Sequence, residues 1–196
     1  MASSKMTQQF FTSRAYVAGD VLSNHDQQSI NLRELPPFLR CLLVADGTVT
    51  KAIEAYFWEP IEVRPLHQQL ITLDHEQPFL ESAAARPALQ RVVSLIGEHS
   101  GITYATAISY IHADALSADR FQQLENEEIG IGELLRESEL ESYREIVDFG
   151  ITANSQTSEL RQQTERCNEL YRTYRVLMGG EPAIQITEYF PIERFS

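Results

Sequence analysis

The chain has 196 residues, 43% of them hydrophobic and 22% charged, which is typical of a globular protein and excludes a disordered or fibrous chain. A net charge of −12 disfavours binding to nucleic-acid phosphates and to acidic membrane surfaces. The first 20 residues lack the apolar core of a signal peptide, and no run of about 18 apolar residues predicts a membrane span, so we expect a cytoplasmic protein.

The first predicted elements, after a poorly determined N-terminal segment (residues 1–30), are two helices that form a packed hairpin. The first covers residues 38–44 and ends before Gly47, since glycine is the usual residue past a helix end. Thr48 caps the second helix, which runs over residues 49–57. This second helix carries an apolar stripe with the spacing i, i+4, i+7 and i+8: Val49, Ile53, Tyr56 and Phe57.

The remaining elements are mostly strands, predicted over residues 61–64, 66–73, 89–96, 102–112, 145–150, 171–177 and 183–190. A polar helix over residues 118–125 and a second helix through Leu134, Leu135 and Leu140 interrupt them. Gly179 and Gly180 predict a tight turn between the last two strands. This order predicts one domain over residues 1–196, of α+β class, with an antiparallel sheet.

Neither the cysteines nor the histidines have metal-ligand spacing, so we expect no metal site. Cys41 and Cys167 lie far apart in the sequence, and we expect each to pack as a small apolar residue.

Two charged residues fall on the apolar faces of predicted strands. Because side chains alternate along a strand, Arg91 shares a face with Leu89 and Val93, and Glu188 shares one with Ile184 and Ile186. Charged side chains are rarely buried unless they are paired or belong to a site. One interpretation is a buried salt bridge between the two strands. The other is a pocket in which the planar fork of Arg91 binds a carboxylate, while Glu188 does acid–base or electrostatic work.

Two further features are open to more than one interpretation. The turn Gly130-Ile131-Gly132 precedes a helix, where backbone N–H groups can meet an anion or hydroxyl, although a capped turn without a ligand is the alternative. Arg172 and Arg175 either line a pocket or face solvent, and we expect at least one of them to be solvated.

Four segments, in this order, resemble the chorismate pyruvate-lyase (4-hydroxybenzoate synthase) family, and most closely its longer cyanobacterial and actinobacterial-type branch. They are Leu42–Glu54 (LLVADGTVTKAIE), Leu89–Gly97 (LQRVVSLIG), Gly130–Leu134 (GIGEL) and Arg172–Phe190 (RTYRVLMGGEPAIQITEYF). The resemblance extends over residues 30–191, and the combination that ends in GG-x-P…TE-x-F is fairly specific.

This resemblance implies an antiparallel sheet with helical flaps that enclose an internal pocket. It implies elimination of pyruvate from chorismate to leave 4-hydroxybenzoate, without metal or organic cofactor. The carboxylate-binding arginine of the family falls on Arg91 and its pocket glutamate on Glu188. The backbone contact to the ring substituents falls on Ile131, with Gly132 beside it, and a flap residue falls on Val49.

The sequence departs from the family pattern at two positions. Val49 stands where methionine is common, which leaves a looser lid, and Gly130 stands where many members have proline, which leaves a more flexible turn. Two alternatives to the lyase stay open: a non-catalytic protein that binds a small aromatic acid, and a related lyase or isomerase that makes another hydroxybenzoate. The fold also serves as the effector domain of transcription regulators, but the first 30 residues are too short and not basic enough for a DNA-binding domain.

Overall fold

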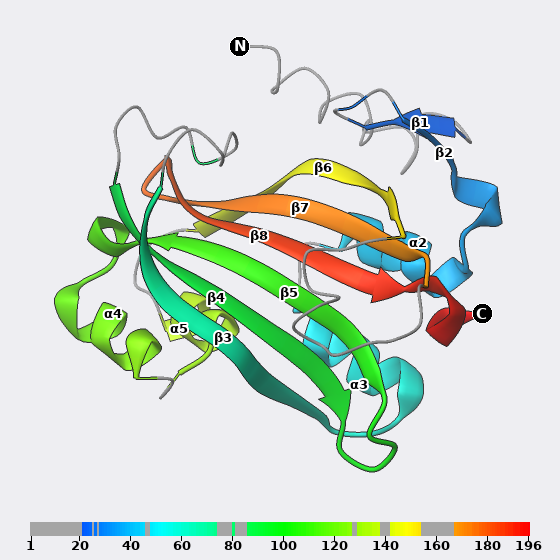
Figure 1. The fold of residues 1–196 in the computed structure, drawn as a ribbon, viewed down its shortest axis with the longest axis horizontal. Helices are drawn as coiled ribbons and strands as arrows, with labels where there is room; N and C mark the ends of the chain where they lie inside the picture. Colours follow the sequence, from blue (N-terminus) through cyan, green and yellow to red (C-terminus); the bar gives the residue numbers. More distant parts are fainter. Residues whose placement is uncertain are drawn as a thin grey trace.

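A sheet of six strands forms the centre of the computed structural model, and every neighbouring pair in it is antiparallel (Figure 1). The strands are β3 (Ile61–Leu73), β4 (Arg86–Gly97), β5 (Thr103–His112), β6 (Ser142–Thr152), β7 (Glu169–Met178) and β8 (Glu181–Pro191). Their order across the sheet is β3-β4-β5-β8-β7-β6, so β8, the last strand of the chain, lies between β5 and β7. The predicted α+β class with an antiparallel sheet is therefore confirmed.

The structure describes residues 21–24, 26, 28–45, 48–73, 80, 86–126, 129–137, 142–153 and 167–196. Two short strands that were not predicted, β1 (Val21–Ser23) and β2 (Ser29–Asn31), pair in antiparallel fashion near the N-terminus. Residues 1–20 and the expected helical position Leu140 lie outside the described residues.

The helices gather on one side of the sheet (Figure 1). They are α2 (Pro37–Val44), α3 (Val49–Phe57), α4 (Ala118–Glu125) and α5 (Ile131–Glu137), with 3-10 turns η1 (Leu32–Glu34), η3 (Ala113–Ala115) and η4 (Ile192–Phe195). The predicted bounds of α3 and α4 are confirmed. Thr48 stands at the N-cap of α3, but its side chain makes no capping hydrogen bond, so that part of the prediction is wrong, whereas the Ser117 side chain caps α4 by accepting from the N–H of Arg120. None of the helices in the described part of the chain is long and apolar enough to cross a membrane.

Two strands run further than the sequence predicted. β3 is one continuous strand, because a register shift between Pro65 and His67 absorbs the proline on this edge strand. β6 continues through Gly150, where the sequence predicted its end. A Cβ atom at Gly150 would lie 2.3 Å from the ring of Tyr171 on β7, so this glycine permits close packing and does not end the strand.

Apolar side chains cover both faces of the sheet. On the helical side, one cluster joins α2 and α3 to the sheet through Leu95 and Phe190, and a second joins α4 and α5 to it through Leu89 and Ile184. A third cluster, around Ile108, lies on the opposite face. The two helical-side clusters leave the middle of that face for the pocket described below.

Cys41 is exposed, so the expectation that it packs as a small apolar residue is wrong. It lies on the outer side of α2, whose inner side buries Leu39, Leu42 and Leu43. Cys167 is half-buried.

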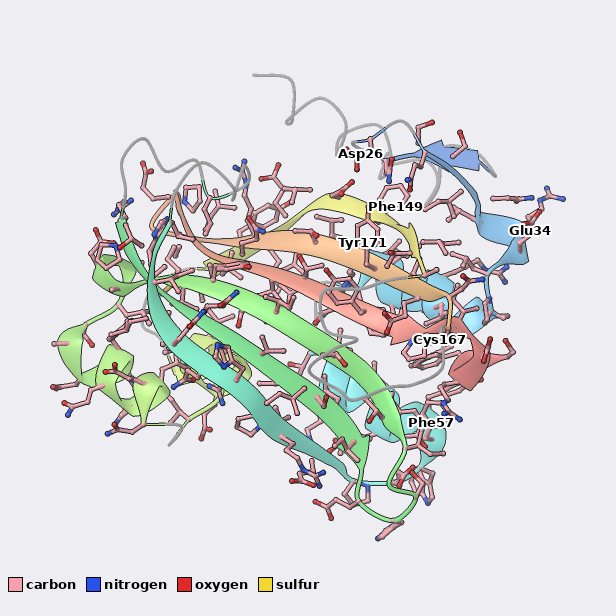
Figure 2. The ribbon with its side chains drawn as sticks, viewed as in Figure 1. Asp26, Glu34, Phe57, Phe149, Cys167 and Tyr171 are labelled. Carbon is pink, nitrogen blue, oxygen red and sulfur yellow. The ribbon has the colours of Figure 1, made fainter. Side chains whose placement is uncertain are left out.

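Individual contacts join the smaller elements to the sheet (Figure 2). The ring of Phe57, at the end of α3, stacks on Tyr104 of β5 with 4.0 Å between the ring centroids. On the opposite face, the hydroxyl of Tyr171 accepts from Asn24 Nδ2 at 3.2 Å and donates to Asp148 Oδ2 at 3.3 Å. Burial, followed by the charge of Asp148, raises the pKa of Tyr171 to about 12, so it stays a neutral hydrogen-bonding group at neutral pH.

His112, at the end of β5, makes stability depend on pH. Its side chain is buried, and burial, followed by the charge of Arg86, lowers its pKa below the ordinary value of 6.5. The unfolded chain therefore takes up this proton first, and the stability due to neutral His112 is lost as the pH falls from 6.5 to its folded-state pKa. We expect the free energy of unfolding to fall there by up to about 1.4 kcal/mol per pH unit.

Urea unfolding at several pH values between 5 and 8 measures this effect. The variant His112→Gln should lack this part of the pH dependence while retaining that of the carboxylates. If the free energy of unfolding depended on pH in the same way in the wild type and in His112→Gln, the assignment to His112 would be contradicted.

Candidate functional site

A pocket of about 580 Å³ lies on the helical side of the sheet, within the usual range for small-molecule sites, roughly 300–1,000 Å³. Its walls come from the sheet and from the first residues of α3 and α5. All five residues that the sequence singled out as site residues line it: Val49, Arg91, Ile131, Gly132 and Glu188. The structure thus brings them into one pocket, and their roles in binding and chemistry stay predictions.

Strand register explains why Arg91 and Glu188 face the same pocket. Arg91 of β4 lies opposite Ser109 of β5, and Glu188 of β8 lies opposite Ala107, the next residue of β5 on the same face. The two charged residues are therefore separated by one strand that contributes only small side chains. Small side chains between two longer ones leave a hollow in the sheet surface, and Ala107 and Ser109 line the pocket at this place.

The carboxylate of Glu188 lies in a buried ion pair. Arg172 of β7 donates from Nε to Glu188 Oε2 at 2.7 Å, and the Tyr174 hydroxyl donates to Oε1 at 3.3 Å. The Arg172 side chain is 1% exposed and that of Glu188 is 9% exposed. Glu188 is therefore held by two donors from the neighbouring strand.

The pairing of Arg172 with Glu188 was not predicted from the sequence, and neither Tyr174 nor Arg144 was singled out there. We expected Arg172 or Arg175 to be solvated, and this is wrong for both, since Arg175 Nε also donates to a carboxylate, Glu145 Oε2, at 2.7 Å. The side chain of Arg175 is 11% exposed, and it lies on the opposite face of β7 because it is three residues from Arg172. The one signal in the sequence was strand alternation, which places Arg172 on the same face as Tyr174 and Val176 and so on an apolar face.

Burial, followed by the charge of Glu188, raises the pKa of the Tyr174 phenol. The phenol therefore keeps its proton at neutral pH and acts as a hydrogen-bond donor to Glu188.

Arg91 connects the sheet to the turn before α5. Its Nη1 donates to the carbonyl oxygen of Ile129 at 3.2 Å, and its side chain is buried. Gly130 begins the helix, since its carbonyl oxygen accepts from the N–H groups of Glu133 at 3.1 Å and Leu134 at 2.9 Å. Ile131 and Gly132 of the first turn line the pocket, and helix geometry gives first-turn N–H groups no partner within the helix.

Other charged side chains also border the pocket. Arg144 of β6 lies on the side of Tyr174, opposite Val176 of β7, and it is half-buried. Lys51 of α3 forms an ion pair with Glu54 at 2.6 Å, and its side chain is 70% exposed. The pocket is therefore lined by two arginines, Arg91 on β4 and Arg144 on β6, with three strands between them.

Residues 43–196 match the sequence model of a protein family described as "Chorismate pyruvate-lyase Rv2949c-like". The chain belongs to this family. Relatives named "Chorismate pyruvate-lyase" include a protein of Mycobacterium leprae, 30% identical over 86% of this chain and 81% of its own length. Another, from Mycobacterium tuberculosis, is 27% identical over 81% of this chain and 82% of its own length.

Solved structures of lower identity share the fold of this lyase family member. PhnF from Mycobacterium smegmatis superposes with a TM-score of 0.57 at 14% identity, over 78% of this chain and 67% of its own. A GntR-family transcriptional regulator from Bacillus cereus gives a TM-score of 0.54 at 9% identity, over 69% of this chain and 94% of its own. At such identities the likeness concerns the fold alone.

Proposed function

We propose that this chain is a chorismate pyruvate-lyase, which eliminates pyruvate from chorismate and leaves 4-hydroxybenzoate. The observation that carries the proposal is the placement of buried Arg91 and Glu188 on either side of a hollow floored by Ala107 and Ser109, in a chain of this family. We also propose that residues 1–196 form one domain, which acts in the cytoplasm without a cofactor. The net charge of −12 supports a small-molecule substrate and not a nucleic-acid or membrane partner.

The substrate presents the groups that this pocket can recognise. Chorismate carries a ring carboxylate, a ring hydroxyl, and an enolpyruvyl ether that bears a second carboxylate. Arg91 binds the ring carboxylate, because a guanidinium meets a carboxylate with two parallel hydrogen bonds. Glu188 then lies beside the hydroxyl or the departing ether oxygen, across the small side chains of β5.

The reaction itself needs little besides orientation and control of one proton. The bond between the ring carbon and the ether oxygen breaks with its electron pair going to the oxygen, the ring carbon that bears the hydroxyl loses its proton, and the ring becomes aromatic. The departing enolpyruvate takes up one proton at its methylene carbon and leaves as pyruvate. Glu188 acts near this carbon either by taking the proton or by accepting a hydrogen bond from the hydroxyl. Buried, fixed groups such as Arg91 and Glu188 act more strongly than solvated ones, because they need no reorganisation during the reaction.

The direct test is to incubate the purified protein with chorismate and to follow both products. We expect stoichiometric release of pyruvate and 4-hydroxybenzoate, measured by a coupled dehydrogenase assay and by chromatography. No release above the uncatalysed background would exclude the lyase. Tight binding of 4-hydroxybenzoate without turnover would instead favour a binding protein, and a different regioisomer would identify a related lyase or isomerase.

Arg144 is expected to bind the second carboxylate of the substrate. Arg144 lines the same pocket from β6, the strand beside the β7 strand that carries Tyr174. Chorismate is a dianion, so its second carboxylate needs a cation besides Arg91. Arg144→Gln should raise the KM for chorismate by roughly 10- to 150-fold, which corresponds to the loss of one charge-assisted contact of about 1.5–3 kcal/mol.

The product lacks this carboxylate and provides the control. The Kd for 4-hydroxybenzoate, measured by calorimetry, should stay within about twofold of the wild-type value. An equal loss of affinity for chorismate and for 4-hydroxybenzoate would contradict this role of Arg144.

A further inference from the structure

Arg172 contacts two parts of the molecule at once. On one side, its Nε donates to Glu188 Oε2 at 2.7 Å. On the other side, its Nη1 donates to the carbonyl oxygens of Leu42 and Ala45, the latter at 2.7 Å. Leu42 and Ala45 lie at the C-terminal end of α2, so a single side chain joins the pocket carboxylate to a helix end.

The contact with α2 has a clear physical reason. The last carbonyl groups of a helix have no partner within it and carry the negative end of the helix dipole, so a cation is favourable there. α2 has no basic residue in its own last turn, and Arg172 of β7 supplies the charge. Since Arg172 is 1% exposed, loss of the Glu188 charge would leave a buried guanidinium without its counter-charge.

The helix that Arg172 contacts, α2, is followed in the chain by α3, whose first residue lines the pocket. We call α2 and α3 (Pro37–Val44 and Val49–Phe57) the helical hairpin. Val49, the first residue of α3, and Thr48, its N-cap, line the pocket, four and three residues after Ala45. The far end of the hairpin is anchored separately, by the stacking of Phe57 on Tyr104.

We propose that Arg172 is a positioning residue that couples the Glu188 carboxylate to the helical hairpin over the pocket. The same guanidinium orients the carboxylate and holds the hairpin end that leads to Val49. A change of charge at Glu188 therefore loosens the hairpin, and displacement of the hairpin releases the carboxylate from its fixed position. The coupling goes beyond the proposed lyase reaction, and its use in catalysis rests on that reaction.

Amide hydrogen exchange of the free protein tests the coupling. Exchange should become at least about tenfold faster at the end of α2 and in the hydrogen-bonded amides of α3, which begin at Ala52, in Arg172→Gln, while the amides of β4 and β5 keep their rates. Glu188→Gln should accelerate the same hairpin amides, although this substitution is made on β8. The double variant should exchange no faster than Arg172→Gln, because both substitutions weaken the same ion pair between residues 172 and 188.

The ion pair of Arg175 and Glu145 provides a matched control. It has the same Nε–Oε2 distance of 2.7 Å, on the opposite face of β7. Arg175→Gln and Glu145→Gln should leave the exchange of the hairpin unchanged. Equal acceleration in these controls, or hairpin exchange in Glu188→Gln that matches the wild type, would overturn the proposal.

The coupling can be tested even if one variant does not fold, and independently of lyase activity. If Arg172→Gln does not fold, Glu188→Gln and its control Glu145→Gln decide the question. The exchange measurement needs no substrate, so an inactive protein with a coupled hairpin would contradict only the proposed function. An active lyase whose hairpin is insensitive to Glu188→Gln would contradict only the coupling.

Discussion

Arg91→Ala is expected to lower kcat/KM for chorismate by about 30- to 5,000-fold, the equivalent of roughly 2–5 kcal/mol of lost transition-state stabilisation. The magnitude is large because Arg91 is buried, so that a bound carboxylate would lose its counter-charge away from water. Arg91→Lys should recover only part of the loss, since an ammonium group lacks the planar fork of a guanidinium.

Steady-state kinetics with chorismate and calorimetry with 4-hydroxybenzoate measure this prediction, because product and substrate share the ring carboxylate. A matched control is Arg64→Ala on β3, whose side chain is 53% exposed and paired with Glu62 on the surface. The control should keep wild-type kcat/KM. Full activity in Arg91→Ala would place the carboxylate site elsewhere in the protein.

Glu188→Gln is expected to lower kcat strongly while the protein stays folded, because glutamine has the same shape, its carbonyl oxygen can accept from Arg172 Nε, and its NH2 group can donate to the hydroxyl oxygen of Tyr174. A loss of about 100- to 10,000-fold is typical when a general acid or base is removed. Loss of a single hydrogen bond to a charged group, by contrast, costs about 1.5–3 kcal/mol, or roughly 10- to 150-fold.

The size of the loss of kcat separates the two roles of Glu188. If Glu188 takes the proton, the loss in Glu188→Gln exceeds the roughly 150-fold that a lost hydrogen bond to a charged group accounts for. Glu145→Gln is the control, because it removes a carboxylate with the same arginine geometry outside the pocket. Wild-type kcat in Glu188→Gln would exclude both roles.

Local sequence patterns predicted most of the elements. The apolar stripe and the Thr48 position gave the bounds of α3, and the strands of the sheet were found within a few residues. The Gly179-Gly180 turn is confirmed, with φ values of 61° and 89° that glycine adopts without strain. These features depend on residues close in sequence, and so they can be inferred without the tertiary structure.

The pair of Arg172 and Glu188 shows where such inference ends. Counting back from the two-residue turn, Met178 pairs with Glu181, and a regular register would place Arg172 opposite Thr187. A register shift between Val176 and Leu177 moves Arg172 opposite Glu188 instead. No local pattern marks this shift, which depends on how β7 and β8 pack against the rest of the sheet.

The sequence by itself determined the class of the fold, the elements, and the two charged residues on apolar strand faces, because alternation and periodicity are properties of neighbouring residues. Only the tertiary structure decided that β8 lies between β5 and β7, and that small side chains of β5 separate Arg91 from Glu188. It also decided that Arg172 holds both Glu188 and the end of α2. Strand order, register shifts and contacts to backbone carbonyls depend on the packing of the whole sheet. The contact between Arg172 and the Leu42 carbonyl, for example, joins residues 130 positions apart and forms only when the whole chain packs.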